Sequence, residues 1–160
     1  DTYMEEMYKQ GSYEPLTLDE AINLSKKMLI YLERSGIKVI RIGLQPTDDL
    51  KMGDNVVAGP YHPSMRQLVE AEIFKDMILH LLNHTKADTM DQIQIFCNPR
   101  DLSTVMGQKR ANYEYVKKLY RHKAVAFKED TDLDIGSIMT ISGEKTVILS
   151  KNTFYHGLEF

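Results

Sequence analysis

The chain has 160 residues, a formal net charge of −3 and 42% hydrophobic residues, close to one ordinary water-soluble domain. No apolar run is long enough to cross a bilayer, and no secretory signal is visible. The single cysteine, Cys97, rules out an internal disulfide, so we expect a cytoplasmic protein with no membrane partner. The sequence begins at Asp1 without a methionine, which indicates a fragment of a longer protein.

The first part of the chain predicts helices followed by one strand. A short helix over 1–11 precedes a capping box of Thr17 and Glu20, which opens a second helix ending near Gly36. The β-branched run over 37–44 predicts a strand. A helix followed closely by such a strand is the αβ part of a βαβ unit, so this part predicts the end of a larger α/β body.

The middle of the chain predicts a loop, the longest helix and a short strand. Residues 45–61 are irregular and rich in Pro, Gly and Asp. Pro63 at a first helical position predicts that a long helix covers 63–83. Residues 92–97 alternate, which predicts a strand whose odd-numbered side chains face a core.

Two short helices and further strands are expected after this strand. Asn98 as N-cap and Pro99 at the first helical position begin one helix, and Gly107 ends it. The second helix carries apolar residues inward at helical spacing: Tyr113, Val116, Leu119 and Tyr120. Residues 124–127 open another strand, and 137–150 form a hairpin with a four-residue loop. The order predicts a β-α-α-β unit followed by a C-terminal β-hairpin.

The turn between these two helices carries a recognisable signature. The segment 105–113, VMGQKRANY, resembles the GxxG signature of K-homology (KH) domains, whose turn clamps the backbone of single-stranded nucleic acid. Gly107 stands at the first glycine position and Arg110 at the second, so a guanidinium replaces a bare backbone. The resemblance and the local charge predict this nucleic-acid-binding set: Gly107, Gln108, Lys109, Arg110, Lys117, Lys118 and Arg121.

The segment around this turn is basic in an acidic chain. Residues 98–123 hold seven basic and two acidic side chains, a net charge of +5. A basic surface is the electrostatic footprint of a polyanion, here single-stranded RNA or tRNA. The alternative interpretation is the solvated helix surface of a small α+β domain.

Three phrases near the N-terminus carry a second resemblance: MYKQGSYEPL at 7–16, RIGLQPT at 41–47 and VAGPYHP at 57–63. They resemble the C-terminal portion of radical S-adenosylmethionine (SAM) proteins of a bacterial group. This group is related to the Elongator catalytic subunit and is often labelled oxygen-independent coproporphyrinogen III oxidase-like. The resemblance implies a parent oxidoreductase or modification enzyme with a partial (β/α) barrel, a [4Fe–4S] cluster and bound SAM. It also implies that Arg41 and Gln45 face SAM or substrate at the end of the last barrel strand.

The chemistry of that family does not extend to this chain. A SAM-binding cluster needs three cysteines in a CxxxCxxC spacing, and only Cys97 is present. We therefore expect no catalytic residue, no metal site and no cofactor in the fragment itself. His80 and His84 lack a third ligand nearby, and 130–134 lacks the glycine and glutamate of a calcium loop.

The sequence thus predicts an α/β (α+β) protein in three parts. Residues 1–47 would be the terminal αβ unit of the partial barrel, 48–62 a linker, and 63–160 a KH-like domain. We expect an accessory region that presents substrate, with RNA as the leading candidate, to the barrel of its parent. The alternatives are a structural lid, a dimerisation module that joins two copies through the unpaired 1–47 segment, and the wall of a pocket for a porphyrin-like molecule.

Overall fold

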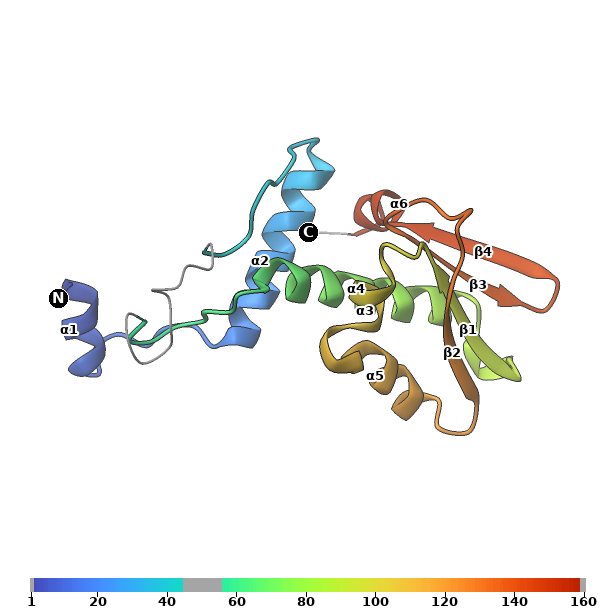
Figure 1. Cartoon of the computed structure of the whole chain (residues 1–160), viewed down its shortest axis with the longest axis horizontal. Coiled ribbons are helices and arrows are strands. Elements are labelled where there is room, and N and C mark those ends of the chain that lie inside the picture. The colour runs from blue at the N-terminus through green and yellow to red at the C-terminus, as the bar shows by residue number, and fades with distance from the viewer. Residues whose placement is uncertain (1, 45–55, 159–160) are drawn as a thin grey trace.

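The computed structural model describes residues 2–44 and 56–158, which form an elongated α+β structure (Figure 1). The helices are α1 (Tyr3–Lys9), α2 (Leu18–Arg34), α3 (Met65–His84), α4 (Leu102–Met106), α5 (Ala111–Leu119) and α6 (Lys151–His156), with short 3-10 turns η1 (Ala87–Thr89) and η2 (Gln108–Arg110). The strands are β1 (Gln92–Cys97), β2 (Ala124–Glu129), β3 (Ser137–Ser142) and β4 (Lys145–Ser150). Over the described residues, the helices are too short or too polar to span a membrane.

The four strands form one mixed sheet in the order β2-β1-β3-β4. β1 and β2 run parallel with Gln92 opposite Ala124, and they are joined through α4 and α5. The antiparallel β3 pairs with β1 on one side and β4 on the other, so the predicted β-α-α-β unit with a C-terminal hairpin is confirmed. The hairpin loop has two residues instead of the predicted four, because Gly143 at φ 60° permits a tight turn.

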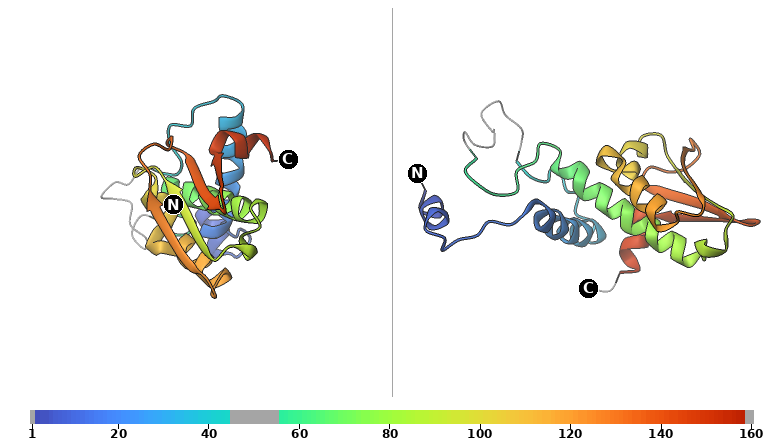
Figure 2. Two further views of the ribbon diagram at one scale, coloured as in Figure 1. Left: turned by 90° about the vertical axis from the view of Figure 1, so that its right-hand side faces the viewer. Right: turned by 90° about the horizontal axis from the view of Figure 1, so that it is seen from below.

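One face of the sheet packs on α3. The odd-numbered residues of β1, Ile93, Ile95 and Cys97, are fully buried as predicted. The central helix α3 contributes a long series of buried side chains to the same core: Met65, Val69, Ala71, Ile73, Phe74, Met77, Ile78, Leu81 and Leu82. Seen from the side of the sheet, α3 lies behind the strands, and none of the described helices covers their outer face (Figure 2).

The helix α2 packs on α3 from the side opposite the sheet (Figure 1). It starts at the predicted capping box, in which the Thr17 and Glu20 side chains each accept a hydrogen bond from the backbone N–H of the other. Leu29 and Ile30 are buried in the same core cluster as α3 and the sheet. Met28, in contrast, is 56% exposed. The residues before 44 therefore share the core of the later elements.

The strand predicted over 37–44 is wrong, because this segment has no regular secondary structure. A strand needs a hydrogen-bonding neighbour, and the sheet lies on the far side of α3 (Figure 1). Instead of a ladder partner, the Val39 carbonyl accepts a hydrogen bond from Arg66 Nη1 at 2.8 Å. Val39 and Ile42 pack partly buried against the core, whereas Ile40 between them is 88% exposed.

The start of α4 also differs from the prediction. The helix begins at Leu102 instead of Pro99. The Asn98 side chain accepts a hydrogen bond from Arg100 N at 3.0 Å and donates one to the Leu133 carbonyl at 2.8 Å. Asn98 was expected to be an N-cap. Its side chain instead stabilises a turn and holds the loop before β3.

Two further expectations about helices were wrong. The helix α3 begins at Met65, two residues after Pro63, and the Ser64 side chain makes no cap hydrogen bond. Leu119 was expected to point inward, but it is 53% exposed. The reason is that α5 ends there, and Tyr120 fills the core position from a non-helical backbone.

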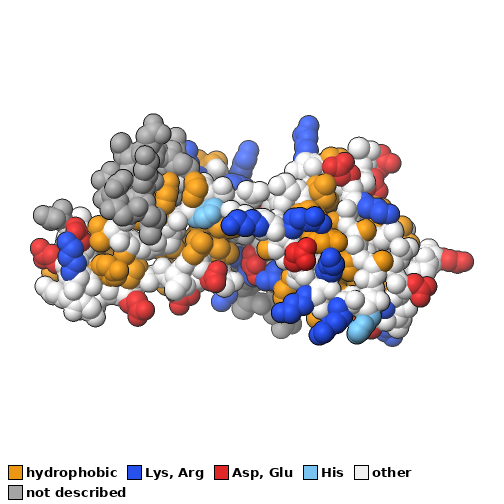
Figure 3. All heavy atoms as spheres, turned by 60° about the horizontal axis from the view of Figure 1, so that its bottom comes forward, with side chains coloured by type: hydrophobic (Ala, Val, Ile, Leu, Met, Phe, Trp, Pro, Cys, Tyr) orange, Lys and Arg blue, Asp and Glu red, His pale blue; other side chains and the backbone are white. Residues whose placement is uncertain are grey.

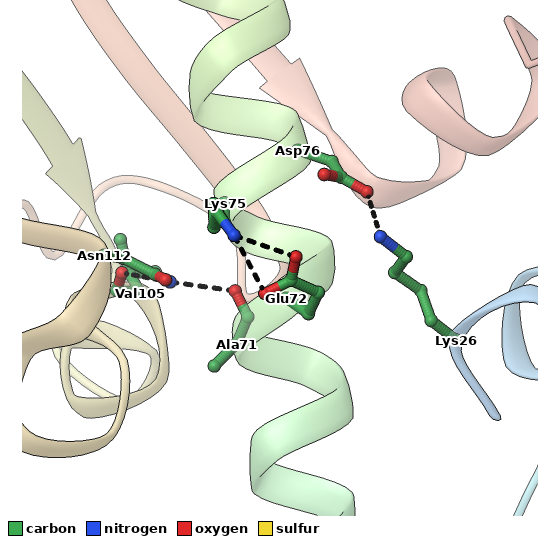
Figure 4. A network of polar contacts seen from close by, with 7 residues as sticks. All are labelled: Lys26, Ala71, Glu72, Lys75, Asp76, Val105 and Asn112. Carbon is green, nitrogen blue, oxygen red and sulfur yellow. Dashed lines mark hydrogen bonds and ion pairs between the residues drawn. The ribbon is translucent and has the colours of Figure 1, made fainter. Parts of the chain in front are cut away.

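The buried Asn112 fixes the beginning of α5. Its Nδ2 donates to the Ala71 carbonyl of α3 at 2.8 Å and to the Val105 carbonyl of α4 at 3.1 Å (Figure 4). Only 4% of the residue is exposed. Because unsatisfied buried carbonyls are costly, one side chain couples three helices around the α4–α5 turn.

We expect that Asn112→Ala lowers the free energy of unfolding by about 1–3 kcal/mol, since two carbonyls lose a donor in a buried place. Urea denaturation of the two proteins measures the difference. The matched control is Asn23→Ala on the exposed surface of α2, which should change the free energy by less than about 0.5 kcal/mol. A loss at Asn112 no greater than that at Asn23 would contradict this role.

Candidate functional site

The turn between α4 and α5 has a backbone with several positive φ angles. Gly107 has φ 78°, Lys109 φ 52° and Arg110 φ 64°. A side chain on residue 107 would place its Cβ 3.0 Å from the backbone nitrogen of Asn112, so the position requires glycine. For Lys and Arg, the left-handed conformation costs roughly 1–2 kcal/mol per residue. Arg110 thus keeps the conformation that a glycine would favour there.

The side chain of Arg110 is held by an aromatic ring. Its Cζ lies 4.5 Å from the centroid of the Tyr113 ring, and Lys117 Nζ lies 5.8 Å from the same centroid. Tyr113 itself packs edge-on against Phe127 of β2, at 5.6 Å between centroids. The ring is therefore anchored on the sheet, and cation–π attraction places the guanidinium over it.

An exposed basic surface runs from the turn along α5. We call it the α5 surface, and it consists of Lys109, Arg110, Lys117, Lys118 and Arg121. Basic side chains gather on this face of the molecule (Figure 3). Within the described residues, none of the five forms an ion pair, whereas Lys26, Arg66 and Lys75 do. The structure thus brings together the charged residues that the sequence assigned to nucleic-acid binding.

A cavity of about 410 Å³ lies on the other side of the turn, between α2, α3 and the start of α5. Its wall includes Gly107 and Gln108, together with Asp19, Glu72 and Lys75. Lys75 is neutralised by Glu72 at 3.0 Å (Figure 4). Because acidic groups line this cavity, a polyanion fits the α5 surface better.

Gln108 connects the turn to the segment before α3. Its Nε2 lies 3.4 Å from His62 Nε2, and His62 Nδ1 accepts a hydrogen bond from Ser64 N at 3.1 Å. Gln108 therefore lies beside the segment that leads into α3.

A second candidate surface is apolar and lies on α2. Leu24, Met28 and Tyr31 are 51%, 56% and 63% exposed and recur at helical spacing. We call these three residues the α2 stripe. The opposite side of the helix buries Leu29 and Ile30, so α2 is apolar on two faces. A surface helix of a globular protein normally has one such face, so the stripe is a candidate contact site.

The two residues predicted to face SAM or substrate have different outcomes. Arg41 is exposed on the irregular segment after α2, where the expected strand is absent. Gln45 lies outside the described residues. The predicted position at the end of a barrel strand is therefore not reproduced for Arg41 in this chain.

The described residues do not fit an iron–sulfur cluster or another metal. Cys97 is fully buried on β1, and its burial raises the pKa of the thiol to about 12, with Asp101 and Glu129 adding to the effect. Over 2–44 and 56–158, no three His, Cys, Asp or Glu side chains converge as a metal site. His80 is exposed and packs edge-on against Phe154 instead, at 5.7 Å between centroids.

Sequence reasoning missed two features of the site. One is Asn112, because a single polar residue in an apolar pattern gives no signal of its long-range hydrogen bonds. The other is the contact between Arg110 and Tyr113. The helical spacing rule does not predict it, because Arg110 lies before α5 in the left-handed conformation.

The comparison with known proteins identifies one region. Residues 1–75 match the model of the Radical_SAM C-terminal domain. Neither a curated protein nor a solved structure matches the chain. The matched residues include α1, α2 and the first half of α3, so they contain the α2 stripe and part of the central helix. This part of the chain is therefore similar to the C-terminal region of radical SAM proteins, an accessory region of those enzymes.

Proposed function

We propose that this chain is the accessory C-terminal region of a radical SAM iron–sulfur enzyme and that it presents an RNA substrate to the barrel. The parent would belong to the bacterial Elongator-catalytic-subunit-like or oxygen-independent coproporphyrinogen III oxidase-like group. Its [4Fe–4S] cluster and SAM would be bound by residues outside this chain, since Cys97 is buried and protonated. The observation that carries the proposal is the family match over residues 1–75, which contain the α2 stripe.

The distribution of exposed apolar side chains supports docking of the N-terminal part. Among the described residues, sixteen large apolar side chains are exposed, and eleven of them lie between Tyr3 and Val57. Ile40 is the most exposed of these residues. It lies in 37–44, the segment that was predicted to be a barrel strand and that has no regular secondary structure in this chain. Exposed apolar side chains in this number are expected where another part of a protein covers them. In the proposal, the barrel of the parent covers the α2 stripe and supplies the strand partner that residues 37–44 lack.

The α5 surface supports RNA as the substrate. Its basic residues form no ion pairs within the described part of the chain, although other lysines of the same protein are paired. Its turn also retains two left-handed non-glycine residues, Lys109 and Arg110. Strained backbone that persists in a folded protein occurs preferentially at binding and catalytic sites. Lys86 is also left-handed, but among the described residues only this turn has two such non-glycine residues in a row, which the solvated-surface alternative does not explain.

The first prediction concerns the enzyme class. The whole protein that contains this chain, reconstituted anaerobically with iron and sulfide, should bind a cluster and cleave SAM when a reductant is added. The isolated chain should do neither, because Cys97 is its only cysteine. Iron and sulfide analysis measures cluster binding, and detection of the SAM cleavage product measures SAM cleavage. A whole protein that binds no cluster would exclude the radical SAM class.

The second prediction concerns docking through the α2 stripe. The triple variant Leu24→Gln, Met28→Gln and Tyr31→Gln should lower the stability of the whole protein by about 2–4 kcal/mol, because three apolar side chains lose a covered site. Thermal or urea unfolding measures the change.

Three equally exposed residues outside the stripe provide the control. Leu119, Ile135 and Ile148 are 53%, 58% and 58% exposed. Their replacement by Gln should be close to neutral. If the two triple variants of the whole protein lose the same stability, the barrel does not cover the stripe.

The third prediction concerns RNA binding. Replacement of both Lys109 and Arg110 by Asp should weaken the binding of a short single-stranded RNA at least tenfold at low salt, because two cations become anions. The salt dependence of binding should also become weaker. Aspartate tolerates the left-handed backbone better than most residues, so the fold should be retained.

The matched control is the double variant Lys38→Asp and Lys86→Asp, which changes the charge equally. Lys86 also has a positive φ, 51°, and neither residue belongs to the α5 surface. This variant should bind RNA nearly as the wild type does. Absence of wild-type binding at low salt would exclude RNA and leave the structural-lid alternative.

A further inference from the structure

We propose that Arg110 is a stacking platform for an unpaired nucleobase, so that the α5 surface selects single-stranded over double-stranded RNA. The proposal rests on the proposed function, in which this surface binds RNA. It adds that the Arg110 side chain contacts a base, whereas a surface that binds through charge alone contacts only phosphates. The geometry of Arg110, Tyr113 and Lys117 carries it.

The guanidinium is the outer layer of a stack built on the sheet. Phe127 supports Tyr113 edge-on at 5.6 Å, and Arg110 Cζ lies over the Tyr113 ring at 4.5 Å. A base cannot take the ring face that Arg110 already covers. The exposed side of the guanidinium is free for one, and guanidinium planes stack on bases as aromatic rings do.

The backbone holds this platform at the turn. Arg110 is in the left-handed conformation directly before α5, so its side chain leaves the chain at the turn and folds onto Tyr113 one helical turn later. Since no ion pair competes for the guanidinium within the described residues, its position depends on the ring. The platform is therefore in place before any ligand arrives.

Two cations lie beside the platform, where they can contact the phosphates next to a stacked base. Lys109 precedes Arg110 in the turn, and Lys117 Nζ lies 5.8 Å from the Tyr113 centroid. In duplex RNA the bases are paired inside the helix and their faces are covered by neighbours. Only an unpaired base can reach the platform, and every base has a π-face. The site should therefore bind single-stranded RNA more tightly than double-stranded RNA, whatever the base sequence.

The central comparison of the experiment uses two proteins and two RNA probes, and further variants and a duplex serve as controls. The probes are an eight-nucleotide single-stranded RNA and the same backbone with abasic nucleotides, so both have equal charge. The proteins are the wild type and Arg110→Lys, which keeps the charge and loses the plane. Lys109 shows that lysine accepts the neighbouring left-handed position, so the variant should fold.

The wild type should bind the normal RNA about tenfold more tightly than the abasic RNA, a difference within the range for stacking of one base. Arg110→Lys should bind both probes alike, at the affinity of the wild type for the abasic probe. Arg110→Gly is the second variant, since glycine favours the observed φ of 64°. It should also bind both probes alike, but more weakly.

The control Lys118→Gln removes a cation without touching the stack, so it should weaken both probes equally and keep the tenfold preference. If Arg110→Lys retains the full preference, Arg110 is not the platform, while RNA binding itself stands. If the wild type binds a duplex of the same length as tightly as the single strand, the selectivity is overturned. If the wild type binds no probe at low salt, both the platform and the RNA function are wrong.

Discussion

The fold depends on the burial of α3 from two sides. The sheet covers one side of this helix and α2 covers another, so Ile73, Met77 and Ile78 are fully buried. Neither neighbour could bury its own apolar face without α3, since the sheet has four strands and α2 is a single helix. The family match ends within α3, at residue 75. The similarity to radical SAM proteins thus includes the first half of the helix that organises the rest of the chain.

This central helix also links the two candidate surfaces. On one side, Lys26 of α2 forms an ion pair with Asp76 at 2.6 Å. On the other side, Asn112 at the start of α5 donates to the Ala71 carbonyl at 2.8 Å (Figure 4). The α2 stripe and the α5 surface are therefore attached to neighbouring turns of one helix. A ligand on α5 would be held at a fixed position relative to whatever covers the stripe.

The features that the sequence predicted well depend on local pattern. The capping box of α2, the buried alternation of β1 and the order β-α-α-β all follow from residues close together in the chain. The strand over 37–44 failed because β-propensity describes a residue that already has neighbouring strands. The start of α4 failed because Asn98 bonds to Leu133, far along the chain, and no local rule contains that partner. In the candidate site, the charges were predictable from the sequence, whereas the stack of Arg110 on Tyr113 requires the backbone conformation of the turn.

Arginine at position 110 changes what the turn between α4 and α5 can offer a ligand, compared with a glycine there. Glycine would give the backbone the same left-handed conformation at lower cost and would let a phosphate approach the amides. Arginine carries the strain and blocks that approach, but Tyr113 lies within 4.5 Å to hold its side chain. The cation–π contact, worth about 0.5–1 kcal/mol at an exposed site, offsets only part of the cost of the left-handed backbone. Stability alone therefore favours glycine at this position, and the proposed stacking of a base on the guanidinium would give arginine a role there.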